Sequence, residues 1–247
     1  MSILTAKLGV PVVARVAEIS ARLASIVLPR VCFLCDAASD NEFLCTDCEA
    51  SLPRLPNRHC DVCALPTPLS DTCGACLNTP PAFDATHAAF VYDFPLNELI
   101  QSLKYQLRLA SVSFLAEALI SLTQHVAQIA RPDIIIPVPL APARLAFRGF
   151  NQSIELARPL AAHLQMKIAR TTAIRSRDTV PQVSLPPKER VKNIRNAFEC
   201  NADLSGKAVW VIDDVMTTGA TLNELARVLK LHGAARVENF VVARATP

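Results

Sequence analysis

The sequence predicts an α/β domain with a parallel sheet, preceded by a small cysteine-rich module. Eight of the nine cysteines lie between residues 32 and 76, and from residue 84 onward strand-like apolar runs alternate with helix-like patterns. That alternation is typical of a parallel sheet covered by helices on both faces. Apolar residues make up 51% of the 247 residues, which excludes a disordered or low-complexity chain.

The elements expected after residue 84 follow from hydrophobic periodicity. We expect strands near 85–92, 133–138, 207–213 and 236–243, and helices near 95–108, 112–129, 151–164 and 220–232. Apolar residues near helical spacing before Pro29 predict an amphipathic helix. We interpret it as a helix that packs on the rest of the protein, and the alternative is an anchor on a membrane surface. Charged residues interrupt this run, so no membrane span is expected. The expected domains are a helix at 1–29, the cysteine-rich module at 30–80 and the α/β domain at 82–247.

The cysteines form an internal repeat. Nine residues separate the two Cys-x-x-Cys pairs of each unit, and the second unit repeats the first at an offset of 28 residues (60 − 32 = 28). Two such turns present four thiolates to one ion, which favours zinc or iron in a closed, structural site. The predicted metal ligands are Cys32, Cys35, Cys45, Cys48, Cys60, Cys63, Cys73 and Cys76.

Three interpretations of the repeat remain. Disulfides would need an oxidising compartment, and no export signal is visible. Iron–sulfur ligation and a double zinc ribbon use the same spacing, and we favour the ribbon with about two zinc ions. Ligation could be sequential or cross-braced, although the duplication favours sequential ligation. Cys200 lies outside the pattern and is interpreted as a plain thiol.

The C-terminal part holds a second motif. An apolar strand at 208–212 leads into two adjacent acids, Asp213 and Asp214, and then into a small hydroxyl-rich loop that opens a helix. Ligands of α/β proteins bind at the carboxyl edge of the sheet, and helix N-termini bind phosphate. Two acids beside such a loop suit a sugar diol next to a phosphate, which describes ribose 5-phosphate. The alternative is an ordinary capped helix after an Asp-rich turn.

This segment, VIDDVMTTGAT, resembles the fingerprint of type I phosphoribosyltransferases. The resemblance implies that Asp213 and Asp214 address the ribose hydroxyls of phosphoribosyl pyrophosphate and serve as catalytic residues. It also implies that the loop wraps the 5-phosphate, and that Mg²⁺ arrives with the pyrophosphate. The ligand-binding residues expected here are Asp213, Asp214, Val215, Met216, Thr217, Thr218, Gly219, Ala220 and Thr221.

Such a fold needs a second anion site for the pyrophosphate. The apolar strand near 133–138 ends in the turn Val138-Pro139-Leu140, and Arg144 and Arg148 follow. The planar guanidinium group suits a diphosphate because it donates two hydrogen bonds at once. Two solvated arginines before a helix are the alternative interpretation.

The Pro-Val-Pro-Leu and Arg-Gly-Phe-Asn-Gln segments, together with the cysteine units, resemble the ComF family of competence-associated phosphoribosyltransferase-like proteins over residues 28–245. Leu103-Lys104-Tyr105 and the stretch around Arg190 match as well, so we add Lys104 and Arg190 to the expected ligand-binding residues. The resemblance implies that 175–193 is a mobile loop that closes over the ligand. It also implies a role in handling incoming single-stranded DNA.

The sequence supports two functional hypotheses best, and a purely structural zinc-ribbon adaptor is the third. The first is a binding protein for phosphoribosyl pyrophosphate or a nucleotide that meets single-stranded DNA or the uptake machinery. The second is a phosphoribosyltransferase with a nitrogen acceptor. Residues 144–195 carry eleven Lys or Arg and three Asp or Glu, a balance of +8, which fits an anionic ligand or a nucleic-acid face. We expect a cytoplasmic protein. Peripheral attachment at the inner membrane and the oligomeric state are both left open.

Overall fold

The computed structural model describes residues 31–39, 43–68, 72–106, 109–125, 131–177 and 193–246. The chain divides into two compact units, residues 1–51 and 52–247, each described here by itself. The first four-cysteine group belongs to the smaller unit and the second belongs to the larger one.

The described part of the smaller unit is a short ribbon. Val31 and Ala38 form an isolated antiparallel bridge, and helix α2 spans Thr46–Ala50. The rings of Phe33 and Phe43 stack with their centroids 5.1 Å apart. Small four-cysteine ribbons gain much of their folding free energy from the bound metal.

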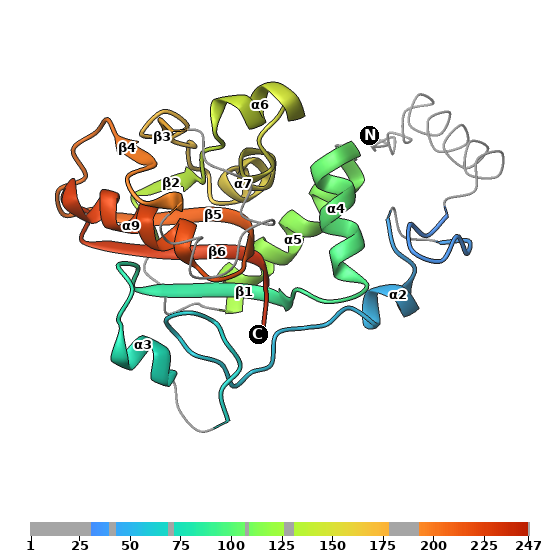
Figure 1. Cartoon of the computed structure of the whole chain (residues 1–247). Coiled ribbons are helices and arrows are strands. Elements are labelled where there is room, and N and C mark those ends of the chain that lie inside the picture. The colour runs from blue at the N-terminus through green and yellow to red at the C-terminus, as the bar shows by residue number, and fades with distance from the viewer. Residues whose placement is uncertain are drawn as a thin grey trace, which may run out of the picture. The chain divides into compact units, whose positions relative to one another are not determined.

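A four-stranded parallel sheet forms the centre of the larger unit, in the order β1-β6-β5-β2 (Figure 1). The strands are β1 at Ala85–Val91, β2 at Ile134–Pro137, β5 at Ala208–Met216 and β6 at Arg236–Arg244. β2 ends at Pro137, opposite Ile212, whereas β5 continues along β6 as far as Met216. The last residues of β5 therefore extend beyond the end of β2, at the carboxyl edge of the sheet.

Helices cover both faces of this sheet (Figure 1). Helix α9 (Ala220–Leu231) packs on one face, against β6 and β4. On the opposite face α5 (Leu109–His125) contacts β1 and β6, and α7 (Gln152–His163) contacts β2 and β5. Helix α4 (Leu96–Gln106) packs on α5. The arrangement follows from strand–helix–strand connections, which place helices alternately over a parallel sheet.

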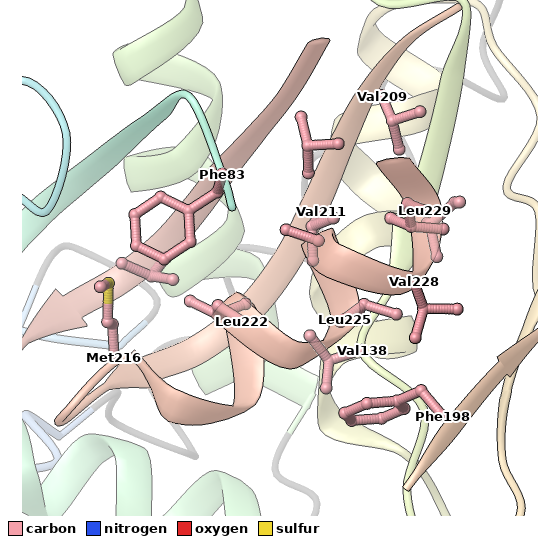
Figure 2. Packing of buried hydrophobic residues seen from close by; sticks show 14 of the residues in the cluster. Phe83, Val138, Phe198, Val209, Val211, Met216, Leu222, Leu225, Val228 and Leu229 are labelled. Carbon is pink, nitrogen blue, oxygen red and sulfur yellow. The ribbon is translucent and has the colours of Figure 1, made fainter. Parts of the chain in front are cut away.

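The core on the α9 side is continuous with the second ribbon. Figure 2 shows Val209 and Val211 of β5 beside Leu225 and Leu229 of α9. The same buried cluster includes three cysteines of the second group, namely Cys60, Cys63 and Cys76. Short helix α3 (Gly74–Asn78) belongs to this ribbon. The second metal site is thus part of the core of the larger unit.

The predicted strands and long helices are confirmed with boundaries shifted by a few residues. β5 runs three residues beyond its expected end, because β6 continues to pair with it. The antiparallel pair β3 (Ala173–Arg175) and β4 (Phe198–Cys200) and helix α6 (Pro142–Arg148) were not expected. The N-terminal helix expected at 1–29 lies outside the described residues, and the domain limits 30–80 and 82–247 stay a prediction. No helix in the described part of the chain combines the length and the apolarity needed to cross a membrane.

Candidate ligand site and metal centres

The eight predicted metal ligands gather into two groups in sequence order. Cys32, Cys35, Cys45 and Cys48 form the first, and Cys60, Cys63, Cys73 and Cys76 form the second. Within each group all four sulfur atoms lie within 4.8 Å of one another. This grouping fits sequential ligation.

The 28-residue repeat of the sequence is also a repeat of structure. Asp36 and Ala64 occupy equivalent left-handed turn positions, with φ of 58° and 56°. Their amides donate to the carbonyls of Cys32 and Cys60 at 2.9 and 2.7 Å. The third cysteine of each unit then precedes a five-residue helix, α2 or α3. Each unit thus builds a complete ligand set from its own turn and helix.

The sulfur spacing fits a tetrahedral zinc site. Cys35 Sγ and Cys45 Sγ are 3.7 Å apart, and Cys63 Sγ and Cys73 Sγ are 3.6 Å apart. Four sulfurs at ~2.3 Å from one zinc ion would lie about 3.8 Å from each other. All nine cysteines lie in the described residues, and none forms a disulfide. Both groups fit structural zinc, and a closed four-thiolate site has no open position for catalysis.

The acid pair lies in the part of β5 that extends past β2. Ser153 Oγ, in the first turn of α7, donates to Asp213 Oδ1 at 2.9 Å, and the amide of Asp214 donates to the same oxygen at 3.0 Å. Lys104 Nζ of α4 lies 2.9 Å from Asp214 Oδ2. Residues from three elements thus hold the two carboxylates in fixed orientations.

The environment of the acid pair changes its protonation. Burial, together with the negative charge of Asp214, raises the pKa of Asp213 to about 7. Burial lowers the pKa of Lys104, but the charge of Asp214 outweighs it and the net shift is upward. Lys104 therefore stays cationic beside Asp214, while Asp213 can take up a proton near neutral pH.

The threonine loop, residues 217–221, joins β5 to α9. Gly219 is the N-cap of α9 and has φ of +79°, a conformation that other residues rarely adopt. A Cβ atom at this position would lie 2.6 Å from Met216 Cε and 3.9 Å from Phe83 Cζ. Met216 and Phe83 lie side by side at one end of the buried cluster (Figure 2). The loop therefore packs on the buried core and leads into the N-terminus of a 12-residue helix.

The Arg-Gly-Phe-Asn-Gln segment shapes the other side of the site. Gly149 ends α6 with φ of +77°, and the Asn151 side chain caps α7 by accepting from the amide of Ser153 at 2.9 Å. Asn151 Nδ2 also donates to the carbonyl of Val138 at 2.9 Å. The cap of α7 therefore holds the Val138-Pro139-Leu140 turn at the carboxyl edge of β2.

These segments converge on one cavity of about 560 Å³. Its walls come from the ends of β1, β2, β3 and β5, from α4 and α6, from the first turn of α7 and from the threonine loop. Predicted residues that line it are Lys104, Val138, Pro139, Leu140, Arg144, Arg148, Asp213, Asp214, Val215, Thr217 and Thr221. A smaller adjoining hollow is lined by Asp213, Val215, Met216, Thr217, Gly219, Ala220, Thr221 and Leu222.

Among the described residues, one predicted residue is not brought to these hollows. Thr218 lies on the exposed side of the loop, where its hydroxyl accepts weakly from the amide of Ala220 at 3.4 Å. Arg190 and most of the expected closing loop at 175–193 lie outside the described residues. Sequence reasoning did not assign five other lining residues to the site: Tyr92, Phe147, Gln152, Ser153 and Arg175. The Asn-x-Ser cap at the start of α7 was the signal that could have indicated Ser153.

A buried arginine connects the second ribbon to the threonine loop. Arg244, at the end of β6, is 4% exposed. Its Nε donates to the carbonyl of Cys63 at 2.7 Å, and its Nη1 donates to the carbonyl of Met216 at 3.0 Å and to that of Thr217. Burial lowers the pKa of Arg244, and charges on the neighbouring thiols oppose that decrease.

Comparison with known proteins matches both parts of the chain. The family profile of the double zinc ribbon domain matches residues 23–77, and that of the phosphoribosyl transferase domain matches residues 151–246. The DNA utilization protein YhgH of Escherichia coli K12 is 33% identical over 225 residues, covering 89% of this chain and 99% of its own. Competence protein F of Haemophilus influenzae is 31% identical, covering 82% and 90%, and competence protein ComFC of Streptococcus pneumoniae is 28% identical, covering 83% and 90%.

The parallel sheet, the acid pair before the threonine loop and the two four-cysteine groups define a protein with a phosphoribosyltransferase fold and a double zinc ribbon. Similarity to these relatives extends over most of both chains. The chain belongs to the ComF family.

Proposed function

We propose that this protein binds phosphoribosyl pyrophosphate with Mg²⁺ in the cavity at the carboxyl edge of the sheet, and that it acts in DNA uptake during natural transformation. The proposed ligand is supported by one observation: the acid pair, the threonine loop and the α6 arginines all line one cavity of about 560 Å³ or the hollow beside it. These groups match the diol, the 5-phosphate and the diphosphate of that ligand.

Each part of the ligand has a chemically suitable partner. The amides and hydroxyls of the threonine loop suit a phosphate dianion at the start of α9. The carboxylates of Asp213 and Asp214 suit the two ribose hydroxyls, and Arg144 and Arg148 suit the pyrophosphate. Mg²⁺ would accompany the ligand as a hard ion that prefers oxygen ligands such as those of its phosphates.

The role in DNA uptake rests on the relatives and on charge. Two relatives are named competence proteins and one a DNA utilization protein. The balance of +8 over residues 144–195 favours contact with a polyanion in addition to the small ligand. We propose that single-stranded DNA is this polyanion.

A phosphoribosyltransferase is the second candidate, and one observation favours it. Phe147, on the cavity wall beside Arg148, is 87% exposed and offers an aromatic face to a planar acceptor. In this reaction the bond from C1 to pyrophosphate breaks and pyrophosphate keeps the electron pair. A nitrogen lone pair then bonds to C1, and the nitrogen loses a proton. Arginine and Mg²⁺ charges stabilise the leaving group.

Calorimetry with phosphoribosyl pyrophosphate, with and without Mg²⁺, tests the ligand. We expect binding that needs Mg²⁺, and we expect Asp213→Asn with Asp214→Asn to abolish it at unchanged zinc content. Asp203→Asn is the matched control, because Asp203 pairs with Ser205 outside both hollows and should leave the affinity unchanged. Binding that survives in the double variant would refute the site.

The same samples separate the two candidate functions. Binding without turnover, with a salt-dependent shift of single-stranded DNA, supports the DNA-uptake role. Release of pyrophosphate with one member of a panel of bases and amines supports the transferase. An absence of both a DNA shift and pyrophosphate release would contradict both candidates.

A further inference from the structure

We propose that Arg244 is a positioning residue through which the second zinc centre sets the conformation of the threonine loop. The identity of the ligand in this inference rests on the proposed function. The coupling between the zinc centre and the loop does not depend on it. It concerns only the larger unit, residues 52–247, to which all of these residues belong.

The contacts of Arg244 join three separate pieces of backbone. One side of the guanidinium donates to the carbonyl of Cys63, a ligand of the second zinc centre, at 2.7 Å. The other side donates to Met216 at 3.0 Å and to Thr217, where the threonine loop begins. The amide of Ala245 closes this arrangement by donating to Met216 at 2.9 Å. A shift at Cys63 is therefore transmitted to the loop through one rigid, planar group.

Arg244 is a buried cation beside the second four-cysteine group. Buried cations require a partner of opposite charge, and no described carboxylate forms an ion pair with Arg244. One Zn²⁺ ion with four thiolates carries a net charge of about −2. Since Arg244 donates to the carbonyl of Cys63, a four-thiolate zinc centre would place negative charge close to this buried guanidinium.

Packing provides a second connection between the same two sites. Cys60 and Cys63 belong to the buried cluster that contains Phe83 and Met216, the side chains closest to Gly219. Close-packed cores transmit displacements because they contain few voids. Loss of zinc should thus move the loop both through Arg244 and through Met216.

Thermodynamic linkage makes the coupling reciprocal. When zinc strengthens the binding of a ligand to the loop, the ligand must strengthen the retention of zinc by the same factor. Typical coupling between two sites changes affinity by about 5- to 150-fold. We expect about tenfold weaker binding of phosphoribosyl pyrophosphate when Arg244 can no longer bridge the two sites.

Amide NMR spectra of the full chain test the coupling without any ligand. In Arg244→Lys, which keeps the charge but loses the planar fork, the signals of Thr217, Thr218 and Gly219 should shift while zinc content stays at about two ions. Arg236→Lys, on the same strand, is the matched control and should leave these signals in place. Cys73→Ser, which removes a ligand of the second zinc centre, should shift them as well, whereas Cys200→Ser should not.

The possible outcomes separate the two proposals. Unchanged loop signals in Arg244→Lys would overturn the coupling, even if Cys73→Ser fails to fold. Shifted signals with about tenfold weaker binding of phosphoribosyl pyrophosphate in Arg244→Lys would support it. If the wild-type chain does not bind this ligand but the loop signals shift, the proposed function fails and the coupling stands.

Discussion

Lys104 and Asp214 form an ion pair in the lining of the candidate site, with Nζ 2.9 Å from Oδ2. The side chain of Lys104 is 23% exposed and that of Asp214 is 7% exposed, so water screens this pair only in part. The neighbouring Asp213 has no such cation at hydrogen-bond distance among the described residues and is held by Ser153 instead. The two adjacent acids therefore differ in their nearest partner, which is a lysine for Asp214 and a hydroxyl for Asp213.

Replacing Lys104 by Met should destabilise the protein by about 1–3 kcal/mol, because it leaves the buried Asp214 carboxyl without its cationic partner. Lys230→Met is the matched control: Lys230 pairs with Asp84 at 2.7 Å, but both side chains are more exposed. Its loss should cost less than about 1 kcal/mol. Urea unfolding measures both.

Adding Asp214→Asn to Lys104→Met completes a double-mutant cycle. The double variant should regain part of the stability lost in Lys104→Met, because no uncompensated charge remains at Asp214. Strictly additive effects would contradict the ion pair.

Asp213 predicts a pH dependence of stability. Its pKa is raised to about 7 in the folded protein and is near 3.8 otherwise, so the folded state binds more protons between these values. The wild type should therefore lose stability relative to Asp213→Asn as pH rises through this range, by up to about 1.4 kcal/mol per pH unit, and the difference should level off above pH 7. Urea unfolding of both proteins between pH 5.5 and 8, at equal zinc content, measures it.

Asp203→Asn provides the comparison for the pH series. Hydrogen bonds from Ser205 lower the pKa of Asp203, so this carboxylate is already ionised throughout the range. Its stability difference from the wild type should be flat with pH. A flat difference for Asp213→Asn as well would show that Asp213 titrates normally.

The main fold and much of the site follow from local sequence. The apolar runs of β1, β2, β5 and β6 and the helical periods of α7 and α9 are strong signals because each buries a continuous face. β3 and β4 have three residues each, too few for a period. α6 was missed because Pro139 and Pro142 indicate a turn, whereas Pro142 begins a short helix.

Long-range contacts could not be predicted from local patterns. Ser153 and Asp213 are 60 residues apart and meet only because β2 and β5 are neighbours in the sheet. Arg244 follows a run of apolar residues and resembles a polar strand end, yet it is buried beneath the threonine loop. Such contacts follow from topology, which a single sequence indicates only coarsely.

Gly219→Ala should strain the threonine loop. Its φ of +79° is costly for alanine, and the added Cβ would lie 2.6 Å from Met216 Cε. We expect a loss of about 1–3 kcal/mol in the free energy of unfolding, with weaker binding of phosphoribosyl pyrophosphate. Gly149→Ala has a similar φ of +77° but no atom within 4 Å of its new Cβ, so it reports the backbone cost alone. Equal losses in the two variants would show that Met216 moves aside freely.

Metal analysis tests the two sulfur groups directly. Two closed four-thiolate sites predict about two zinc ions per chain, and Cys35→Ser should reduce this to about one by removing a ligand of the first group. Cys200→Ser is the matched control and should keep about two, because Cys200 lies in β4 outside both groups. Iron–sulfur clusters would instead give a brown protein containing iron, and disulfides would give a metal-free protein with few titratable thiols. Either result would overturn the double zinc ribbon.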